Sequence, residues 1–200
     1  LIKAGVKVVH LPCGPVRDKS PADPYFDPFW ARMQEAGVLL GLHIGETCFN
    51  EMYAARWGEP ANPPVHRFSA LNTFWGIGAR TIVDQMATMI CHNLFGRFPH
   101  LQVAVIEFGS AWIAPNISVL DKIYRMAEHK TRWSFGKPSE KPSEIFKKHF
   151  SVVPFYEEDI TGLAQLIGVD RVINGSDFPH PEGLEFPVEM ADELANFSEE

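Results

Sequence analysis

Short apolar segments alternate with longer segments of helical periodicity along the chain. Five apolar runs predict buried strands, each bounded by glycine, proline or a polar residue: residues 5–12, 38–42, 101–106, 150–155 and 171–174. Between them, apolar residues recur every three or four positions, which predicts amphipathic helices. This alternation is typical of a parallel sheet in an α/β protein. An open doubly wound sheet and part of a (β/α)8 barrel both fit the pattern.

Capping residues mark the predicted helix boundaries. Asp27 is predicted to be the N-cap of the first helix, with Pro28 at its first position and Gly37 at its end. The second helix is predicted to begin at Thr81 and to end at Gly96. Further helices are expected from Pro115, over residues 143–148, over residues 157–167 and from near Pro187.

A long aromatic-rich segment, residues 44–78, separates the second predicted strand from the helix that follows it. It contains Trp57, His66 and Trp75. Connections of this length inside a compact domain are usually functional or contain local helices. Two roles are open for this segment: a lid over a site, or a contact between the two copies of a homodimer.

Composition indicates one globular domain over residues 1–200 and disfavours several classes of function. The chain is 46% hydrophobic and 22% charged, with 18 basic and 25 acidic residues and a net charge of -7. That balance is a poor match to nucleic-acid binding. No apolar stretch reaches the roughly 18 residues that span a bilayer. Three widely spaced cysteines do not predict a disulfide framework and favour a cytoplasmic location.

Polar side chains gather where the predicted strands end. His43, Glu107 and Asp177 each follow an apolar run directly, and His10 lies near the end of a fourth strand. The carboxyl ends of parallel strands meet on one face, where catalytic residues collect. Each residue alone has a structural interpretation: a hydrogen-bonded histidine, an ion-paired glutamate, or an aspartate that caps a helix. Imidazole and carboxylate together favour a divalent metal site.

Motifs for other chemistries are absent from the sequence. There is no Gly-x-Gly-x-x-Gly after a strand and no phosphate-binding loop, so nucleotide binding is not expected. Ser176 lies in Gly-Ser-Asp rather than in a nucleophile elbow. Cys48 is the cysteine nearest to a strand end, and a buried small side chain is its expected role.

Several segments resemble the amidohydrolase-related family, the branch of the amidohydrolase superfamily that includes aminocarboxymuconate-semialdehyde decarboxylase. The most specific is Gly-Ser-Asp-Phe-Pro-His-Pro-Glu-Gly at residues 175–183. Matching segments follow one order over nearly the whole chain: residues 23–30, 41–45, 96–101, 107–112, 141–144 and 175–183.

The resemblance implies a partial (β/α)8 TIM barrel that corresponds to strands 4 to 8 of a complete one. It also implies one divalent metal, with zinc favoured and manganese as the alternative. His43 matches the metal ligand on strand 5, and Asp177 matches the ligand on strand 8. The family's paired ligands on strand 1 have no His-x-His counterpart in this chain. We therefore expect the chain, which begins at Leu1, to be part of a longer protein.

The activity implied is that of a metal-dependent hydrolase acting on a small carbonyl-type substrate with a metal-activated water. Asp177 would hold the metal and accept the proton of that water, while Glu107 and His180 are candidates for substrate contact or proton transfer. One alternative is a metal-dependent non-oxidative decarboxylase of an aromatic or muconate-type acid. Such decarboxylases have a histidine where this chain has Glu107. The other alternative is an inactive fragment that lacks the N-terminal metal ligands.

Overall fold

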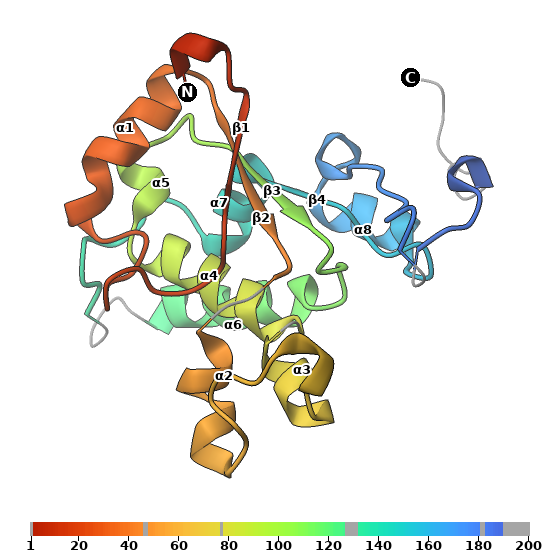
Figure 1. Ribbon diagram of the computed structural model, residues 1–200. Helices are drawn as coiled ribbons and strands as arrows, with labels where there is room; N and C mark the ends of the chain where they lie inside the picture. Colours follow the sequence, from red (N-terminus) through yellow and green to blue (C-terminus); the bar gives the residue numbers. More distant parts are fainter. Residues whose placement is uncertain (1, 46–47, 77, 127–131, 181–182, 190–200) are drawn as a thin grey trace.

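Four parallel strands form a single sheet in a computed structural model that describes residues 2–45, 48–76, 78–126, 132–180 and 183–189 (Figure 1). The strands lie side by side in chain order: β1 (Val8–Leu11), β2 (Leu39–His43), β3 (Val103–Ile106) and β4 (Phe150–Val152). Helical segments connect each strand to the next, since parallel neighbours need a crossover. The predicted α/β class with a parallel sheet is confirmed.

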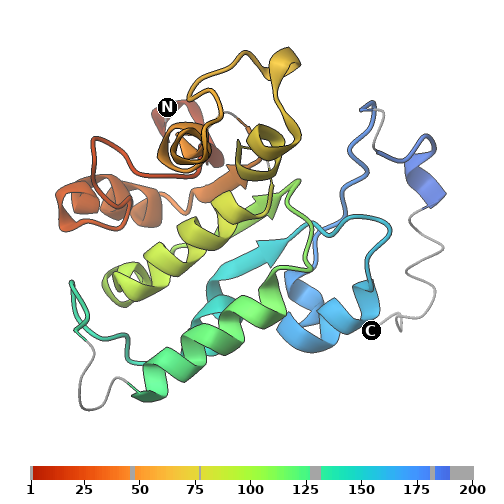
Figure 2. The same cartoon turned by 90° about the horizontal axis from the view of Figure 1, so that it is seen from below.

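Several helices lie next to one another along one face of the sheet (Figure 2). They are α1 (Asp27–Glu35), α4 (Arg80–Cys91), α6 (Ile113–Met126) and α8 (Ile160–Ile167). The other helices complete the connections: α2 (Phe49–Met52), α3 (Ala70–Gly76), α5 (Leu94–Arg97) and α7 (Pro142–His149). No helix among the described residues is both long and apolar enough to cross a membrane.

The two faces of the sheet differ because successive strand residues point to opposite sides. On the face that packs against the helices, Leu40, Leu42, Val103 and Val105 are fully buried. The core on this side includes the apolar stripes of the helices, among them Trp30, Met33, Ile82, Met86, Met89, Ile90, Ile117 and Leu120. Residues on the opposite face, such as His43 and Ile106, remain partly accessible. The open face therefore leads to the polar residues at the strand ends.

The strand predicted over residues 171–174 is wrong as an extended element. The first residue of that run ends a 3-10 turn, Val169–Arg171, and a single parallel bridge joins Val172 to Val152. The Ile173 N–H also donates to the Val152 carbonyl at 2.8 Å. The segment therefore runs beside β4 but forms no regular ladder within the described residues.

Several helix boundaries also differ from the predictions. Asp27 is the first residue of α1 rather than its N-cap, because a 3-10 turn at Pro24–Phe26 leads directly into the helix. Gly37 does end this helix in the left-handed conformation, with φ 58°. Gly96 does not end the second helix: α4 stops at Cys91, and the left-handed Asn93 intervenes before α5.

At the other termini, Asp159 caps α8, so this helix begins at Ile160 rather than at residue 157. The predicted helix near Pro187 appears as a 3-10 turn at Pro187–Glu189, and its continuation lies outside the described residues. In the long segment 44–78, α2 and α3 lie together at one end of the molecule (Figure 1). The local helices expected there are therefore present.

Candidate metal and catalytic site

The predicted site residues lie at the carboxyl ends of neighbouring parallel elements. His43 is the last residue of β2, and Glu107 directly follows β3. The register pairs His43 with Ile106, so Glu107 lies one residue beyond its neighbour on the sheet. Asp177 follows the segment that runs beside β4. Strand topology therefore brings together residues separated by more than 60 positions in the sequence.

Glu107 is the centre of this group. Its Oε2 atom lies 3.0 Å from the Nε2 atom of His43, and its Oε1 atom lies 3.3 Å from the Nδ1 atom of His180. The same His180 nitrogen lies 3.1 Å from Oδ1 of Asp177. The Glu107 side chain is 14% exposed, whereas that of His180 is 59% exposed. The structure thus joins all four predicted residues in one network.

Both carboxylates are presented by an uncommon backbone conformation. Glu107 has φ 61° and Asp177 has φ 56°, in the left-handed region. Holding a residue other than glycine there costs on the order of 1–3 kcal/mol, and such residues concentrate at functional sites. Aspartate tolerates this region better than glutamate does. Both carboxylates of the site therefore have a strained backbone, a conformation that Arg17, Asp18 and Asn93 also adopt elsewhere in the described part of the chain.

Glu158 fixes the loop that follows Glu107. Its carboxylate accepts hydrogen bonds from the backbone N–H groups of Ser110 and Ala111 and from the Ser110 hydroxyl, at 2.7–2.9 Å. It also accepts a bond from the Phe155 N–H at 3.0 Å. Glu158 was not predicted from the sequence, because no local pattern links it to a loop 48 positions away.

The surroundings of His43 indicate which ring nitrogen is free. Its Nδ1 atom lies 2.6 Å from the Ile44 carbonyl, which can only accept, so Nδ1 carries the proton in the neutral ring. The Nε2 lone pair then faces a carboxylate oxygen of Glu107 at 3.0 Å. Two acceptors approach this closely only if a proton or a cation lies between them. A neutral histidine held by a backbone carbonyl is also the usual form of a metal ligand.

The carboxyl groups of Glu107 and Asp177 lie close together, and Asp177 affects the ionisation of Glu107. Burial raises the pKa of the Glu107 carboxyl, and the neighbouring Asp177 carboxyl raises it further. The imidazoles of His43 and His180 oppose this increase. A carboxyl group whose pKa is displaced towards neutrality is suited to proton transfer.

Donor atoms for a cation are close together here. Among the described residues, Glu107, Asp177 and His180 offer ligand atoms that all lie within 4.8 Å of one another. His43 is outside this set and reaches it through Glu107. His10 is not part of this set, but its ring packs edge-on against that of His43, with centroids 5.8 Å apart. The donor chemistry, two carboxylates and two imidazoles, fits a divalent metal.

A cavity of about 550 Å³ adjoins the group, and His43, Glu107 and Asp177 contribute to its wall. The rest of the lining is largely apolar and includes Leu39, Ala104, Ile106, Val153, Pro154, Phe155 and Ile173. No described residue of the segment 44–78 lines this cavity, so the geometry gives no support to the predicted lid. An apolar cavity with a few convergent polar groups is typical of a small-molecule site.

The fold and this site together define a class: an α/β enzyme scaffold with acids and imidazoles at the carboxyl ends of parallel strands. The amidohydrolase family model matches residues 1–199. The chain therefore belongs to the amidohydrolase family. The comparison with curated proteins found no significant match.

Solved structures agree with this assignment. An amidohydrolase from Mycobacterium avium subsp. paratuberculosis K-10 is 35% identical, with a TM-score of 0.84 over 99% of this chain and 48% of its own. A 5-carboxyvanillate decarboxylase from Sphingomonas paucimobilis is 22% identical, with a TM-score of 0.67 over 95% of this chain and 52% of its own. A dihydroxybenzoic acid decarboxylase from Polaromonas sp. JS666, with bound manganese and an inhibitor, is 15% identical, with a TM-score of 0.62 over 90% and 50%.

The chain thus spans about half the length of these solved relatives. Its parallel sheet is similar to part of a TIM-barrel amidohydrolase, which confirms the predicted partial (β/α)8 barrel.

Proposed function

We propose that the protein containing this chain is a metal-dependent hydrolase acting on a small carbonyl-type substrate. The observation that carries the proposal is the network of His43, Glu107, Asp177 and His180 beside a largely apolar cavity. Family membership supports an enzyme, and relatives with bound manganese support a divalent metal. Zinc and manganese both suit the donor set.

In this proposal, His43 and Asp177 hold the metal. His43 is suited to this role because its Nδ1–H is engaged by the Ile44 carbonyl, which leaves Nε2 as the ligating atom. Asp177 offers a carboxylate that is partly buried and lies within reach of the other donors. When bound, a divalent cation supplies a Lewis acid that polarises a carbonyl and lowers the pKa of water.

Glu107 and His180 are the groups proposed to move protons. They are 3.3 Å apart between Oε1 and Nδ1, so a proton can pass between them. Glu107 is partly buried and has a raised pKa, whereas His180 is exposed to solvent. The pair therefore links the interior of the cavity to bulk water.

The second candidate is a non-oxidative decarboxylase. The apolar wall formed by Ile106, Val153 and Phe155 favours a flat substrate such as an aromatic acid. Against it, the decarboxylases that this chain resembles have a histidine at the position where this chain has Glu107. Glu107 thus makes hydrolysis the first candidate.

Metal binding is tested first on the full-length protein, freed of metal by a chelator and titrated with Mn²⁺ and Zn²⁺ in a calorimeter. We expect stoichiometric binding in the wild type and a loss of about tenfold or more in affinity for D177N, since ligand mutations weaken sites strongly. The matched control is D18N, because Asp18 is exposed and also has a left-handed backbone, with φ 57°. Equal affinity in D177N and wild type would refute the assignment of Asp177.

The reaction is tested separately with lactones, amides and aromatic acids, whose products are followed by mass spectrometry. Addition of one water supports the hydrolase. Loss of carbon dioxide supports the second candidate instead.

A further inference from the structure

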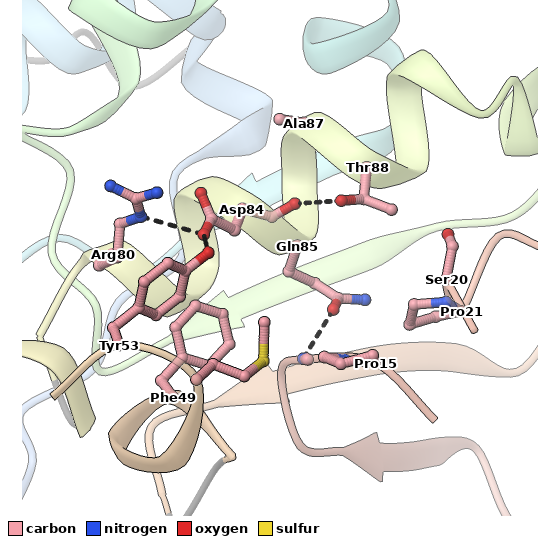
Figure 3. Close-up of a pocket in the computed structure, with 12 residues that line it drawn as sticks. Pro15, Ser20, Pro21, Phe49, Tyr53, Arg80, Asp84, Gln85, Ala87 and Thr88 are labelled. Atoms are coloured by element: carbon pink, nitrogen blue, oxygen red, sulfur yellow. Dashed lines mark hydrogen bonds and ion pairs between the residues drawn. The ribbon is translucent and has the colours of Figure 1, made fainter. Parts of the chain in front are cut away.

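A second cavity lies apart from the candidate site. It has a volume of about 420 Å³ and lies between the loop after β1, helix α2 and helix α4 (Figure 3). It shares no lining residue with the cavity at Glu107. Its size is within the range of about 300–1,000 Å³ usual for small-molecule sites.

A buried amide is directed into this cavity. Gln85 on α4 is 4% exposed, and its Oε1 atom accepts a hydrogen bond from the Gly14 N–H at 3.0 Å. Because a backbone N–H can only donate, this contact fixes the amide orientation and leaves Nε2 as the second group. Nε2 has no acceptor among the described residues and points towards the end of the cavity at Ser20 and Pro21 (Figure 3).

The contact that orients Gln85 depends on the glycine. Gly14 has φ 126°, which other residues rarely adopt, and a Cβ atom there would lie 3.1 Å from Sγ of Cys48. The loop therefore passes close to the start of α2, and from there the Gly14 N–H reaches the amide of Gln85 on α4. The Nε2 group of Gln85 is not among the fully buried side-chain atoms that lack a partner, so it is accessible from the cavity and can donate to water or to a ligand there.

The charged groups of the cavity satisfy one another. Asp84 accepts hydrogen bonds from Arg80 Nε at 3.0 Å and from the Tyr53 hydroxyl at 2.9 Å. The Arg80 guanidinium also lies over the Tyr53 ring, 5.0 Å from its centroid. One cation and one anion thus cancel at this end of the cavity, and the lining has no net charge.

The remaining wall is apolar and includes flat surfaces. Phe49 and Met52 come from α2, while Pro15 and Pro21 come from the loop after β1. An aromatic ring, a thioether and two proline rings favour a planar apolar body.

We propose that this cavity is a binding site for a small neutral molecule with a flat apolar body and one carbonyl oxygen. The carbonyl accepts from Nε2 of Gln85, and the body packs against Phe49, Met52 and the two prolines. The ligand is expected to be neutral because Arg80 and Asp84 pair with each other and leave no net charge in the cavity wall. This site is independent of the proposed hydrolase activity, because no lining residue is shared.

Benzamide is the probe, titrated into the full-length protein with its methionine methyl groups labelled for NMR. We expect a saturable shift of the Met52 methyl signal and no shift at Met126, which is 64% exposed and lies on α6. No saturable shift at Met52, or equal shifts at both methionines, would overturn the proposal. Tighter binding of benzoate than of benzamide would overturn the assignment of a neutral ligand.

The role of Gln85 is tested with Q85E, which keeps the size and the acceptor for Gly14 but replaces the free donor. The dissociation constant for benzamide should rise by about tenfold or more, since a hydrogen bond is lost and two acceptors then face each other. The matched control is Q34E, because Gln34 also accepts a backbone N–H, from His100 at 2.9 Å, outside the cavity. An unchanged constant in Q85E would refute the role of this amide, and the Met52 signal tests the site even if Q85E fails to fold.

Discussion

The two faces of the parallel sheet are built from the same strands but have different roles: one packs in the core and the other leads to the candidate site. Leu42 points to the helices and is fully buried, whereas the next residue, His43, has a side chain that is 40% exposed. The helix side is apolar and tightly packed, and it contributes stability through burial. The open side collects carboxylates, imidazoles and two left-handed backbones at its edge. A single step along a strand therefore separates a residue of the core from a residue of the site.

The largest expected effect is on catalysis at the open face. E107Q keeps the shape of the side chain but removes its titratable proton, so kcat should fall by roughly 10²–10⁴. Metal affinity and the melting temperature should change much less, because the proposed ligands are His43 and Asp177. Steady-state kinetics and calorimetry on the full-length protein measure the two effects, with E35Q on the exposed end of α1 as the control. Unchanged turnover in E107Q would remove Glu107 from the proposed mechanism.

On the helix face, L42A should act on stability instead. Removing a fully buried leucine side chain costs about 2–5 kcal/mol in the free energy of unfolding, through lost burial and the cavity left behind. Denaturant unfolding measures the change. V119A on the outer side of α6, where Val119 is 56% exposed, should stay within about 0.5 kcal/mol. Similar losses in both variants would contradict the division between the two faces.

Glu158 supports the site from outside it: its carboxylate holds the loop after Glu107, although it is not one of the proposed metal ligands. E158Q should reduce the free energy of unfolding by about 1–3 kcal/mol, because one amide group cannot accept all the N–H groups that the carboxylate accepts. It should also lower kcat, because the loop after Glu107 loses its anchor. E144Q, on the exposed Glu144 of α7, is the control. A stable but fully active E158Q would show that the loop is held by other contacts.

The smallest expected effect is a pH dependence of stability at the helix side. His149 is 6% exposed, stacks on Phe95 with centroids 4.3 Å apart and lies 2.8 Å from the Leu101 carbonyl through Nδ1. Burial lowers the pKa of this imidazole below its ordinary value of 6.5. The unfolded chain therefore binds the proton first, and stability present above pH 6.5 is lost as the pH falls below it.

Unfolding curves of wild type and H149Q at pH values on either side of 6.5 isolate this contribution. The advantage of the wild type should shrink as the pH falls. H66Q is the control, because His66 lies on the exposed side of a 3-10 turn. A difference between wild type and H149Q that stays constant with pH would contradict the argument.

Much of the fold was predictable because it depends on local periodicity. The runs that became β1 to β4 and the apolar stripes of α1, α4 and α6 follow from spacing alone. The predicted strand at residues 171–174 was wrong, because its first residue ends a 3-10 turn and only a single bridge, Val172 to Val152, joins the segment to β4. The end of α4 was misplaced because the left-handed Asn93, and not a glycine, interrupts the helix.

The site was predictable in its members but not in its contacts. His43, Glu107 and Asp177 could be found because they directly follow apolar runs and strand ends converge in parallel sheets. The resemblance to a known family assigned ligand positions to His43 and Asp177, which remain predictions. Nothing in the sequence indicated that Glu107 would lie between two imidazoles, or that Glu158 would hold its loop. Those facts depend on side-chain geometry across long sequence separations.

Two neighbouring sides of helix α4 are occupied, so we expect few of its positions to tolerate substitution. Its apolar stripe of Ile82, Met86 and Met89 is fully buried in the core, while its neighbouring stripe of Arg80, Asp84 and Thr88 borders the second cavity. Gln85 lies at the boundary of the two and is itself buried. In a saturation scan of all positions, this helix should accept fewer substitutions per turn than α6, which exposes residues such as Val119 and Met126 to solvent. The number of positions that tolerate substitution would thus show whether a helix packs on one side only or on two.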